Sequence, residues 1–254
     1  MIRLDAVGKT YRTRRGDLVR AVEDVTLHVE ENEFVTLVGP SGCGKSTLLK
    51  LVAGLTPATH GTIAIRGQPV REPFGDVGFV FQQPVLLPWR SVLDNVLFSV
   101  EMLGRQPREY RKQALDLLEL TGLSGFETKY PRELSGGMQQ RVAICRALLP
   151  DPSLLLMDEP FGALDAMTRE EMSLELLRIW EERRKTILFV THSIPEAILL
   201  ADRVVVMTPR PGRVARILPI ALPRPRTMDL EFDARFKAAS DEVRELIFAR
   251  RLDR

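Results

Sequence analysis

The stretch from Gly39 to Thr47 has the residue types and spacing of a polyphosphate-binding loop, because it fits G-x-x-x-x-G-K-[S/T] at every fixed position. Glycines in such a loop let successive backbone N–H groups point inward, and the following helix adds its positive N-terminal end. Lys45 would then place a positive charge at the β- and γ-phosphates, and the Ser46 hydroxyl would ligate Mg²⁺. The predicted nucleotide-contacting residues of this loop are Gly39, Pro40, Ser41, Gly42, Cys43, Gly44, Lys45, Ser46 and Thr47.

Two further candidates follow apolar runs that are typical of buried strands. Asp158 and Glu159 end the run that starts at Ser153, and His192 follows a second run, 186–191. Asp158 could hold Mg²⁺, Glu159 could orient or deprotonate an attacking water, and His192 could hydrogen-bond a γ-phosphate. Each feature is weak alone, since Asp-Glu pairs are common and a single histidine is more often structural.

A second anion site is predicted where Ser135, Gly136 and Gly137 open a helix, since such a turn presents free N–H groups and a hydroxyl. The chain would therefore carry two phosphate-binding ends. Tyr11 could stack on a purine, which is worth about 1–3 kcal/mol by analogy with base stacking on aromatic side chains. By position alone it could equally be a surface tyrosine.

The sequence predicts strands and a helix next to the candidate site residues, in the places needed to position them. An apolar run, 34–38, precedes the phosphate loop, and a helical pattern ending near Gly54 follows it, which disfavours the alternative of a glycine-rich turn that binds nothing. Residues 2–38 are expected to form short antiparallel strands, and 203–207 with 213–218 a hairpin. Ligands of open α/β sheets bind at the carboxyl ends of the strands, where the predicted site residues lie.

The chain is predicted to be a single α/β domain, 1–254, with a mostly helical insertion. In the insertion, Ser91 and Asp94 form a capping-box signature. A last helix is expected to pack its apolar face on its own domain; that face comprises Phe232, Phe236, Ala239, Val243 and Leu246. Binding to a membrane surface is the alternative for this helix, but six acidic residues offset six basic ones from 231 to 254. The predicted parts are a nucleotide-binding core, 1–85 and 151–220, a helical subdomain, 86–150, and a C-terminal extension, 221–254.

Composition favours an ordinary globular protein. Hydrophobic residues make up 44% and charged residues 28% of 254 residues, and the net charge of +2 gives no general nucleic-acid footprint. No apolar run approaches the roughly 18 residues that span a membrane, and no signal core is present at the N-terminus, so a cytoplasmic protein is expected. Cys43 and Cys145 predict neither a disulfide framework nor a zinc site, although modification of Cys43 could block nucleotide. Arginines 210, 213, 216, 224 and 226 form either a basic patch or a solvated turn.

With these motifs in this order, the chain resembles the ATP-binding subunits of ABC transporters over essentially its whole length. The motifs that carry the resemblance are the phosphate loop 39–47, Gln82, the signature 134–141, Asp158 with Glu159, the D-loop 162–165, and His192. The resemblance implies an α/β P-loop NTPase core with an antiparallel β edge and an inserted helical signature subdomain. It also implies ATP and Mg²⁺ as cofactors.

The resemblance further implies a head-to-tail homodimer, in which the phosphate loop of one copy and the signature of the other close on each ATP. By the same comparison Tyr11 would stack on adenine and Glu159 would be the catalytic base. Gln82 would link Mg²⁺ and the attacking water to the membrane-facing groove, and Lys45 and His192 would contact phosphate. The residues implied at the interface with nucleotide are Ser135, Gly136, Gly137, Gln139 and Asp165, and those implied at the metal are Ser46, Gln82 and Asp158.

A finer similarity is to importer ATPases of the nitrate, sulfonate and taurine type, in the segments 86–89, 163–169 and 209–213. It implies a peripheral protein at the cytoplasmic side of the inner membrane, bound to permease subunits and served indirectly by an extracytoplasmic solute-binding protein, with no nucleic acid. The sequence does not decide whether Trp89 is exposed for a permease contact or packs inward. Two other classes stay open: a non-transport ABC ATPase acting on nucleic acid or the ribosome, and the cassette of an exporter or lipid-trafficking system.

Overall fold

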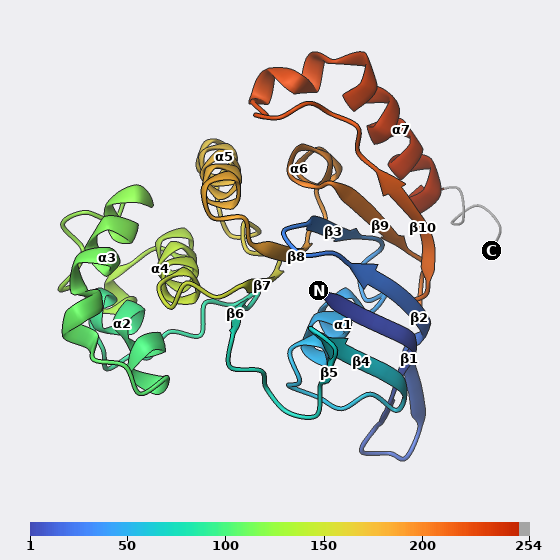
Figure 1. The fold of residues 1–254 in the computed structure, drawn as a ribbon, viewed down its shortest axis with the longest axis horizontal. Coiled ribbons are helices and arrows are strands. Elements are labelled where there is room, and N and C mark those ends of the chain that lie inside the picture. Colours follow the sequence, from blue (N-terminus) through green and yellow to red (C-terminus); the bar gives the residue numbers. More distant parts are fainter. Residues whose placement is uncertain (249–254) are drawn as a thin grey trace.

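A computed structural model describes residues 1–248 and contains two β-sheets with helices around them (Figure 1). The larger sheet has the strand order β10-β9-β3-β8-β7-β6, and all neighbours are parallel except β9 and β10. Every residue of β3, β7 and β8 is buried, as expected for strands covered on both faces. The strands of this sheet are β3 (Phe34–Val38), β6 (Val77–Val80), β7 (Leu154–Asp158), β8 (Thr186–Val190), β9 (Arg203–Met207) and β10 (Val214–Pro219).

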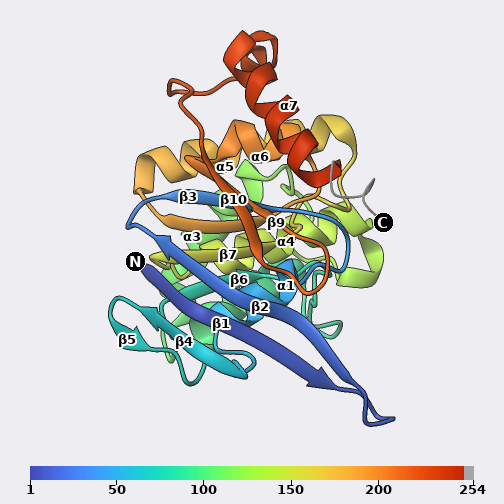
Figure 2. The same ribbon diagram turned by 90° about the vertical axis from the view of Figure 1, so that its right-hand side faces the viewer.

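The second sheet is antiparallel, with the order β2-β1-β4-β5. Its strands are β1 (Ile2–Arg12), β2 (Leu18–Val29), β4 (His60–Ile65) and β5 (Gln68–Pro69). The expectation of short strands was wrong for β1 and β2, which form one long hairpin (Figure 2). Irregular pairing within it, with left-handed backbone at Ala6 and Asp24, breaks the alternation of side chains that would have marked a long strand.

Helix α1 (Lys45–Val52) begins directly at the phosphate loop and packs between the two sheets. Its buried face, which includes Leu48, Leu49 and Val52, joins apolar residues of β1 and β2 on one side and of β3 and β8 on the other. This packing fixes the loop at the carboxyl end of β3.

Three helices gather on one side of the molecule, away from the antiparallel sheet (Figure 1). They are α2 (Val92–Met102), α3 (Pro107–Leu120) and α4 (Gly136–Leu148), with a 3-10 turn η1 (Pro131–Glu133) before α4. Ser91 caps α2 by accepting a hydrogen bond from the Asp94 N–H, as predicted. The three helices share an apolar core of their own, to which Val96, Leu118 and Val142 belong.

The face of the parallel sheet that lies opposite α1 is covered by α5 (Ala166–Arg183), α6 (Ile194–Leu200) and α7 (Ala234–Phe248). The expectation that the last helix packs on its own domain is confirmed for Phe236 and Val243, which are buried. Phe232 was assigned to the wrong environment. It lies in the 3-10 turn η2 (Met228–Phe232) before α7 and is 92% exposed, because that turn takes it off the helical face. Residues 249–254 of the expected extension lie outside the described part of the chain.

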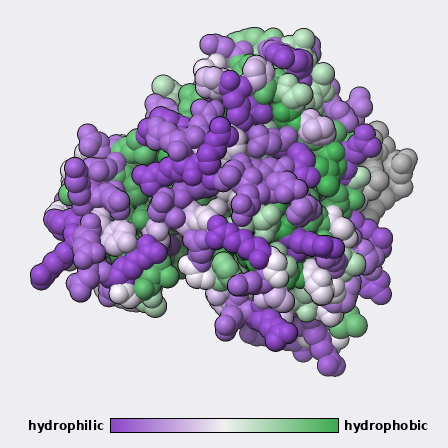
Figure 3. Space-filling view, viewed as in Figure 1, coloured by the Kyte–Doolittle hydropathy of each residue, from purple (hydrophilic) through white to green (hydrophobic). Residues whose placement is uncertain are grey.

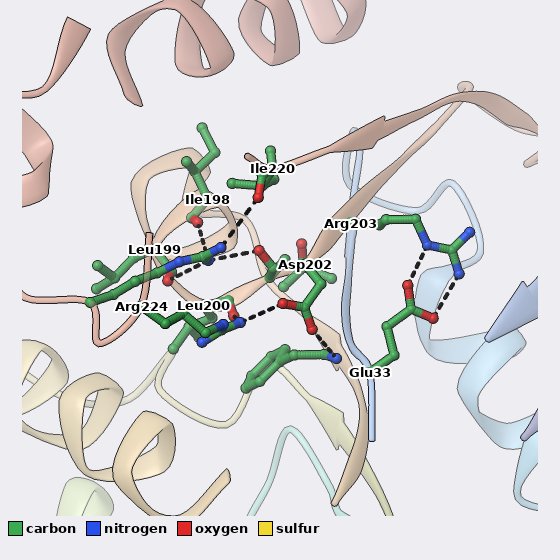
Figure 4. Close-up of polar contacts among 12 residues, drawn as sticks. Glu33, Ile198, Leu199, Leu200, Asp202, Arg203, Ile220 and Arg224 are labelled. Atoms are coloured by element: carbon green, nitrogen blue, oxygen red, sulfur yellow. Dashed lines mark hydrogen bonds and ion pairs between the residues drawn. The ribbon is translucent and has the colours of Figure 1, made fainter. Parts of the chain in front are cut away.

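Neither alternative for the five arginines, a basic patch or a solvated turn, holds for Arg224 and Arg226, because both donate to backbone carbonyls at the end of α6. Figure 4 shows Arg224 at this position. Arg226 is 4% exposed and donates to the backbone carbonyls of Ile198, Leu199, Ala201 and Ile220. Arg224 donates to the Leu200 carbonyl and to Asp202, and its guanidinium lies 4.0 Å from the centre of the Trp180 ring. Both side chains therefore serve as caps for carbonyls that end a helix.

The face of the molecule seen in Figure 3 is mostly hydrophilic, with hydrophobic residues in small separate groups. Within residues 1–248, no helix combines the length and apolar character needed to cross a lipid bilayer.

Candidate active site

The predicted polar residues lie at the carboxyl ends of four adjacent parallel strands. The phosphate loop follows β3, Asp158 ends β7, and His192 and Gln82 come shortly after β8 and β6. One cleft of about 320 Å³ is lined by nine of the predicted site residues: Ser41, Gly42, Gly44, Lys45, Ser46, Thr47, Gln82, Glu159 and His192. The location agrees with the rule that ligands of open α/β sheets bind at this edge.

The phosphate loop is held in a curled form by close contact with β2. Gly44 has a φ of 106°, and a Cβ atom there would lie 2.7 Å from the Ala21 carbonyl oxygen, so only glycine fits. The Lys45 side chain is 4% exposed, and its ammonium donates to the carbonyls of Gly39 at 2.9 Å and Pro40 at 3.2 Å. Among residues 1–248, no side chain caps the start of α1, which leaves its N–H groups available to an anion.

Asp158 and Ser46 form a pair of oxygen ligands at the cleft: Ser46 lines it, and Asp158 is buried behind Ser46. The Ser46 hydroxyl donates to Asp158 Oδ1 at 2.8 Å. Burial raises the pKa of Asp158 above its ordinary value; the hydrogen bond from Ser46 opposes this change, and the nearby charge of Glu159 adds to it. The carboxylate thus carries a desolvation cost that a bound cation would offset.

Glu159 is held between residues from two other strands. Gln82 Nε2 donates to Glu159 Oε2 at 3.0 Å, and His192 Nε2 lies 2.6 Å from Glu159 Oε1. The Glu159 backbone is left-handed, with a φ of 50°, a conformation that costs energy in a non-glycine residue and is enriched at functional sites. The Glu159 side chain is therefore held in one orientation by contacts with residues that follow β6 and β8.

The signature residues lie apart from this cleft. Ser135 caps α4 by accepting from the Met138 N–H at 3.2 Å, and Gly136 is exposed. Gln139 uses its amide to donate to the carbonyls of Pro131 and Leu134, so it braces the turn before the helix. Among the described residues that line the phosphate cleft, none belongs to 134–141.

Asp165 and Tyr11 also lie outside the lining of the cleft. Asp165 caps α5 by accepting from the Thr168 N–H at 3.0 Å, and this hydrogen bond lowers the pKa of the Asp165 carboxyl. Tyr11 lies near the end of β1 with its ring 39% exposed, and the Lys9 ammonium is 5.1 Å from the ring centre. A single copy of the chain therefore does not bring all the predicted nucleotide-contacting residues together.

Cys43 is buried within the phosphate loop, and burial raises the pKa of its thiol. The thiolate form that most reagents require is disfavoured there. The structure gives no support to the idea that modification of Cys43 controls nucleotide access.

An apolar groove of about 440 Å³ lies beside Gln82, between β6 and the helices α2 and α4. Phe79, Phe81, Leu87, Phe98 and Met102 are among its lining residues. Trp89, in the segment that follows Gln82, is 71% exposed, so the inward-packed alternative is wrong.

Two residues that brace the segments around the site were not assigned a role from the sequence. Gln140, fully buried in α4, donates to the Phe81 carbonyl next to Gln82, which ties the signature helix to β6. Arg146 donates to the carbonyls of Pro84 and Val85 in the following loop. A polar residue in a helix has the same local pattern whether it faces water or a buried carbonyl, so periodicity could not find these contacts.

Comparison with known proteins identifies the family. Residues 22–162 match the profile of the ABC transporter domain. The chain is 46% identical over 241 residues to the taurine import ATP-binding protein TauB of Rhizobium johnstonii, covering 95% of this chain and 88% of that one. It is 47% identical over 255 residues to the nitrate import ATP-binding protein NrtD of Synechococcus elongatus, covering 98% and 92%.

Solved structures agree with this result. The ABC transporter cassette MJ0796, in a dimeric structure, matches with a TM-score of 0.80 and 36% identity over 88% of this chain and 100% of that one. A dimeric post-hydrolysis state of MJ0796 bound to ADP and inorganic phosphate matches equally well. The α/β fold predicted from the sequence is thereby confirmed. The chain belongs to the ABC transporter family, as one of its ATP-binding ATPase subunits.

Proposed function

We propose that this chain hydrolyses ATP in the cleft at the carboxyl ends of β3, β6, β7 and β8, and that it thereby powers a membrane importer of a small solute. The observation that carries the proposal is Glu159, which lies between Gln82 and His192 in the same cleft as the phosphate loop. This combination joins a group that can activate water to a cradle that can hold a polyphosphate.

The residues at the base of the cleft would bind the phosphates and a magnesium ion. Lys45 and the N–H groups of the loop would hold the phosphate chain. Ser46 and Asp158 fit Mg²⁺, because a hydroxyl and a carboxylate 2.8 Å apart are hard oxygen donors, and this ion is commonly bound by one or two carboxylates together with phosphates. When bound, the ion would neutralise charge that develops on the phosphates.

Glu159 would act as the general base toward the attacking water, with His192 and Gln82 holding its carboxylate in place. Gln82 would in addition connect the metal site to the segment that follows it. Tyr11 would stack on the adenine ring, since it is partly exposed near the end of β1.

A second copy of the chain would complete each site. Ser135, Gly136 and Gly137 present an open helix start, yet they lie outside the cleft of their own chain. In a head-to-tail dimer these residues, together with Gln139 and Asp165, would close on the ATP held by the partner copy. The dimeric structure of MJ0796 supports assembly of two copies.

Separate permease subunits would receive the energy of dimer closure through the groove beside Gln82. The groove is apolar, and Trp89, which comes two residues after the groove-lining Leu87, is exposed, as suits a protein contact. The relatives named for taurine and nitrate import favour a small anionic or zwitterionic solute. By the family resemblance, an extracytoplasmic binding protein would deliver it. The subunit would then lie on the cytoplasmic face of the membrane, as a core, 1–85 and 151–220, with a helical signature subdomain, 86–150, and an extension, 221–254.

The test is a pull-down of tagged Glu159→Gln protein with ATP from detergent-solubilised membranes of its own organism, with partners identified by mass spectrometry. A multi-span permease, recovered with ATP and lost from a Trp89→Ala variant, is the expected result. Recovery of ribosomal, nucleic-acid-associated or only soluble partners would overturn the transport assignment while leaving the ATPase assignment intact.

A further inference from the structure

The turn between β9 and β10, residues 208–213, packs against the outside of the phosphate loop near the start of α1 (Figure 2). The Gly212 N–H donates to the Ala21 carbonyl at 3.0 Å, and the Gly212 carbonyl accepts from the Glu23 N–H at 3.0 Å. A Cβ atom at Gly212 would lie 1.9 Å from the Cys43 carbonyl oxygen, so the two backbones are in direct contact. The Thr208 hydroxyl closes the turn by donating to the Pro211 carbonyl and accepting from the Arg213 N–H.

Arg210 extends from this turn over the phosphate loop. Its Nε and Nη2 atoms both donate to the Gly42 carbonyl oxygen, each at 3.1 Å. Its side chain also lines the cleft that contains Lys45, Ser46 and Glu159. A second cation is therefore placed at the rim of the phosphate site by a turn more than 160 positions away in sequence.

The charge of Arg210 is not neutralised within the described chain. Its neighbour Arg213 pairs with Glu23 at 2.8 Å, whereas no carboxylate among residues 1–248 lies within ion-pair distance of Arg210. Two of its nitrogens are engaged with a neutral carbonyl, and the side chain stays exposed. An uncompensated guanidinium beside a phosphate-binding loop is a suitable donor to an anionic ligand.

We propose that Arg210 is an additional nucleotide-binding residue, which donates to the polyphosphate of ATP and at the same time braces the phosphate loop through Gly42. The inference rests on the proposed function, since it requires the nucleotide to occupy this cleft. Arginine suits both tasks, because its planar fork offers several donors in fixed directions, while lysine offers a compact point charge.

The test compares nucleotide binding by Arg210→Ala, Arg210→Lys and wild type, with ATP and ADP as titrants in isothermal calorimetry at two salt concentrations. Arg216→Ala is the matched control, because Arg216 is an exposed arginine of the same hairpin without a contact to the loop. We expect Arg210→Ala to raise the Kd for ATP about tenfold or more, the scale of one lost charge-assisted hydrogen bond, and to weaken its salt dependence. The Kd of Arg210→Lys for ATP should lie between those of wild type and Arg210→Ala, and Arg216→Ala should bind ATP as tightly as wild type.

Two outcomes would overturn the proposal: a wild-type Kd in Arg210→Ala, or an equal rise in Arg210→Ala and Arg216→Ala. Turnover at saturating ATP should change far less than the Kd, and the melting temperature of Arg210→Ala should stay near that of wild type, since the side chain is exposed. A Lys45→Ala variant separates this inference from the proposed function. If Lys45→Ala bound ATP as tightly as wild type, the cleft itself would not be the nucleotide site.

Discussion

Glu159 is the residue on which hydrolysis depends in the proposed site, because it alone offers a carboxylate between Gln82 and His192. Glu159→Gln keeps the shape of the side chain and removes the base. We expect turnover to fall by a factor of about 10² or more, the usual contribution of a general base, with ATP binding retained. Phosphate release measured beside calorimetric ATP binding checks this prediction, and full turnover in the variant would show that another group activates the water.

Asp158 is predicted to reduce the stability of the ligand-free protein at neutral pH. Burial raises the pKa of this carboxyl, so its ionised form is disfavoured in the folded state. With the folded pKa above the unfolded value, the destabilisation is absent below the unfolded pKa, grows as pH rises between the two values, and is complete above the folded pKa. Asp158→Asn should therefore melt at a higher temperature than wild type at pH 7, and the difference should shrink as pH falls toward 4.

Asp165 is the control for this measurement, because the hydrogen bond from the Thr168 N–H lowers its pKa. The ionised Asp165 therefore stabilises the folded state, whereas the ionised Asp158 destabilises it. Its stabilising contribution is present above the unfolded pKa and is lost as pH falls through the folded one. Asp165→Asn should give no stabilisation at pH 7, since asparagine is also a good helix cap. A melting temperature for Asp158→Asn at or below that of wild type would contradict the prediction, as would equal stabilisation by both variants.

The phosphate loop and the Asp158-Glu159 pair were predictable from the sequence, because each directly follows an apolar strand. That position places them at the carboxyl edge of the sheet. Gln140 and Arg210 could not be read in this way. Each contacts a backbone carbonyl, of Phe81 or of Gly42, that lies far away in sequence, and only the assembled fold shows these partners.

At the element scale, α6 joins the catalytic edge to the C-terminal segment. It begins at Ile194, directly after His192 and Ser193. At its far end Arg224 (Figure 4) and also Arg226 donate to backbone carbonyls. Asp202 accepts from Arg224 and also from the Phe34 N–H at 2.9 Å, where β3 begins. The segment after β10 thus holds the ends of two elements that lead to the active site.

Arg226→Ala is expected to destabilise the protein by about 3–5 kcal/mol, because it leaves backbone carbonyls buried without their charged donor. The free energy of unfolding from denaturant titration measures this loss. Arg235→Ala is the control, since Arg235 makes an ion pair with Asp233 at the surface, and pairs of this kind contribute little to stability. Equal losses in the two variants would show that the buried contacts of Arg226 contribute nothing special.

Elements with an unbroken apolar run, such as β3, β7 and β8, were predictable because strands buried on both faces have a composition that few other short segments share. The length of β1 and β2 was not predictable, because bulges in these strands interrupt the alternation of buried and exposed side chains. Two-residue β5 has too few positions to show a period at all. The position of Phe232 was missed because a 3-10 turn precedes α7 and shifts its register.

At the scale of the whole molecule, the groove beside Gln82 is the expected contact with the permease. Trp89→Ala should weaken permease binding and solute uptake while ATP binding and basal turnover stay near wild type, because Trp89 is 71% exposed and lies outside the cleft. Uptake and ATPase rate, measured together in reconstituted membranes, check this expectation. Leu18→Ala, another side chain that is 71% exposed, is the control; unchanged uptake in Trp89→Ala would remove the groove from the interface.

ATP hydrolysis in the proposed site requires two copies of the chain, because the signature and the phosphate loop lie apart within one copy. Light scattering after size exclusion, applied to Glu159→Gln with ATP and Mg²⁺, tests it most directly. We predict a mass twice the 28.7 kDa of one chain with ATP, and no such species when Ser135→Asp is added. That second change keeps a good helix cap but sets a negative charge against the partner's phosphates. A Glu159→Gln protein that binds ATP and stays monomeric, or one that dimerises equally well with Ser135→Asp, would contradict the head-to-tail site.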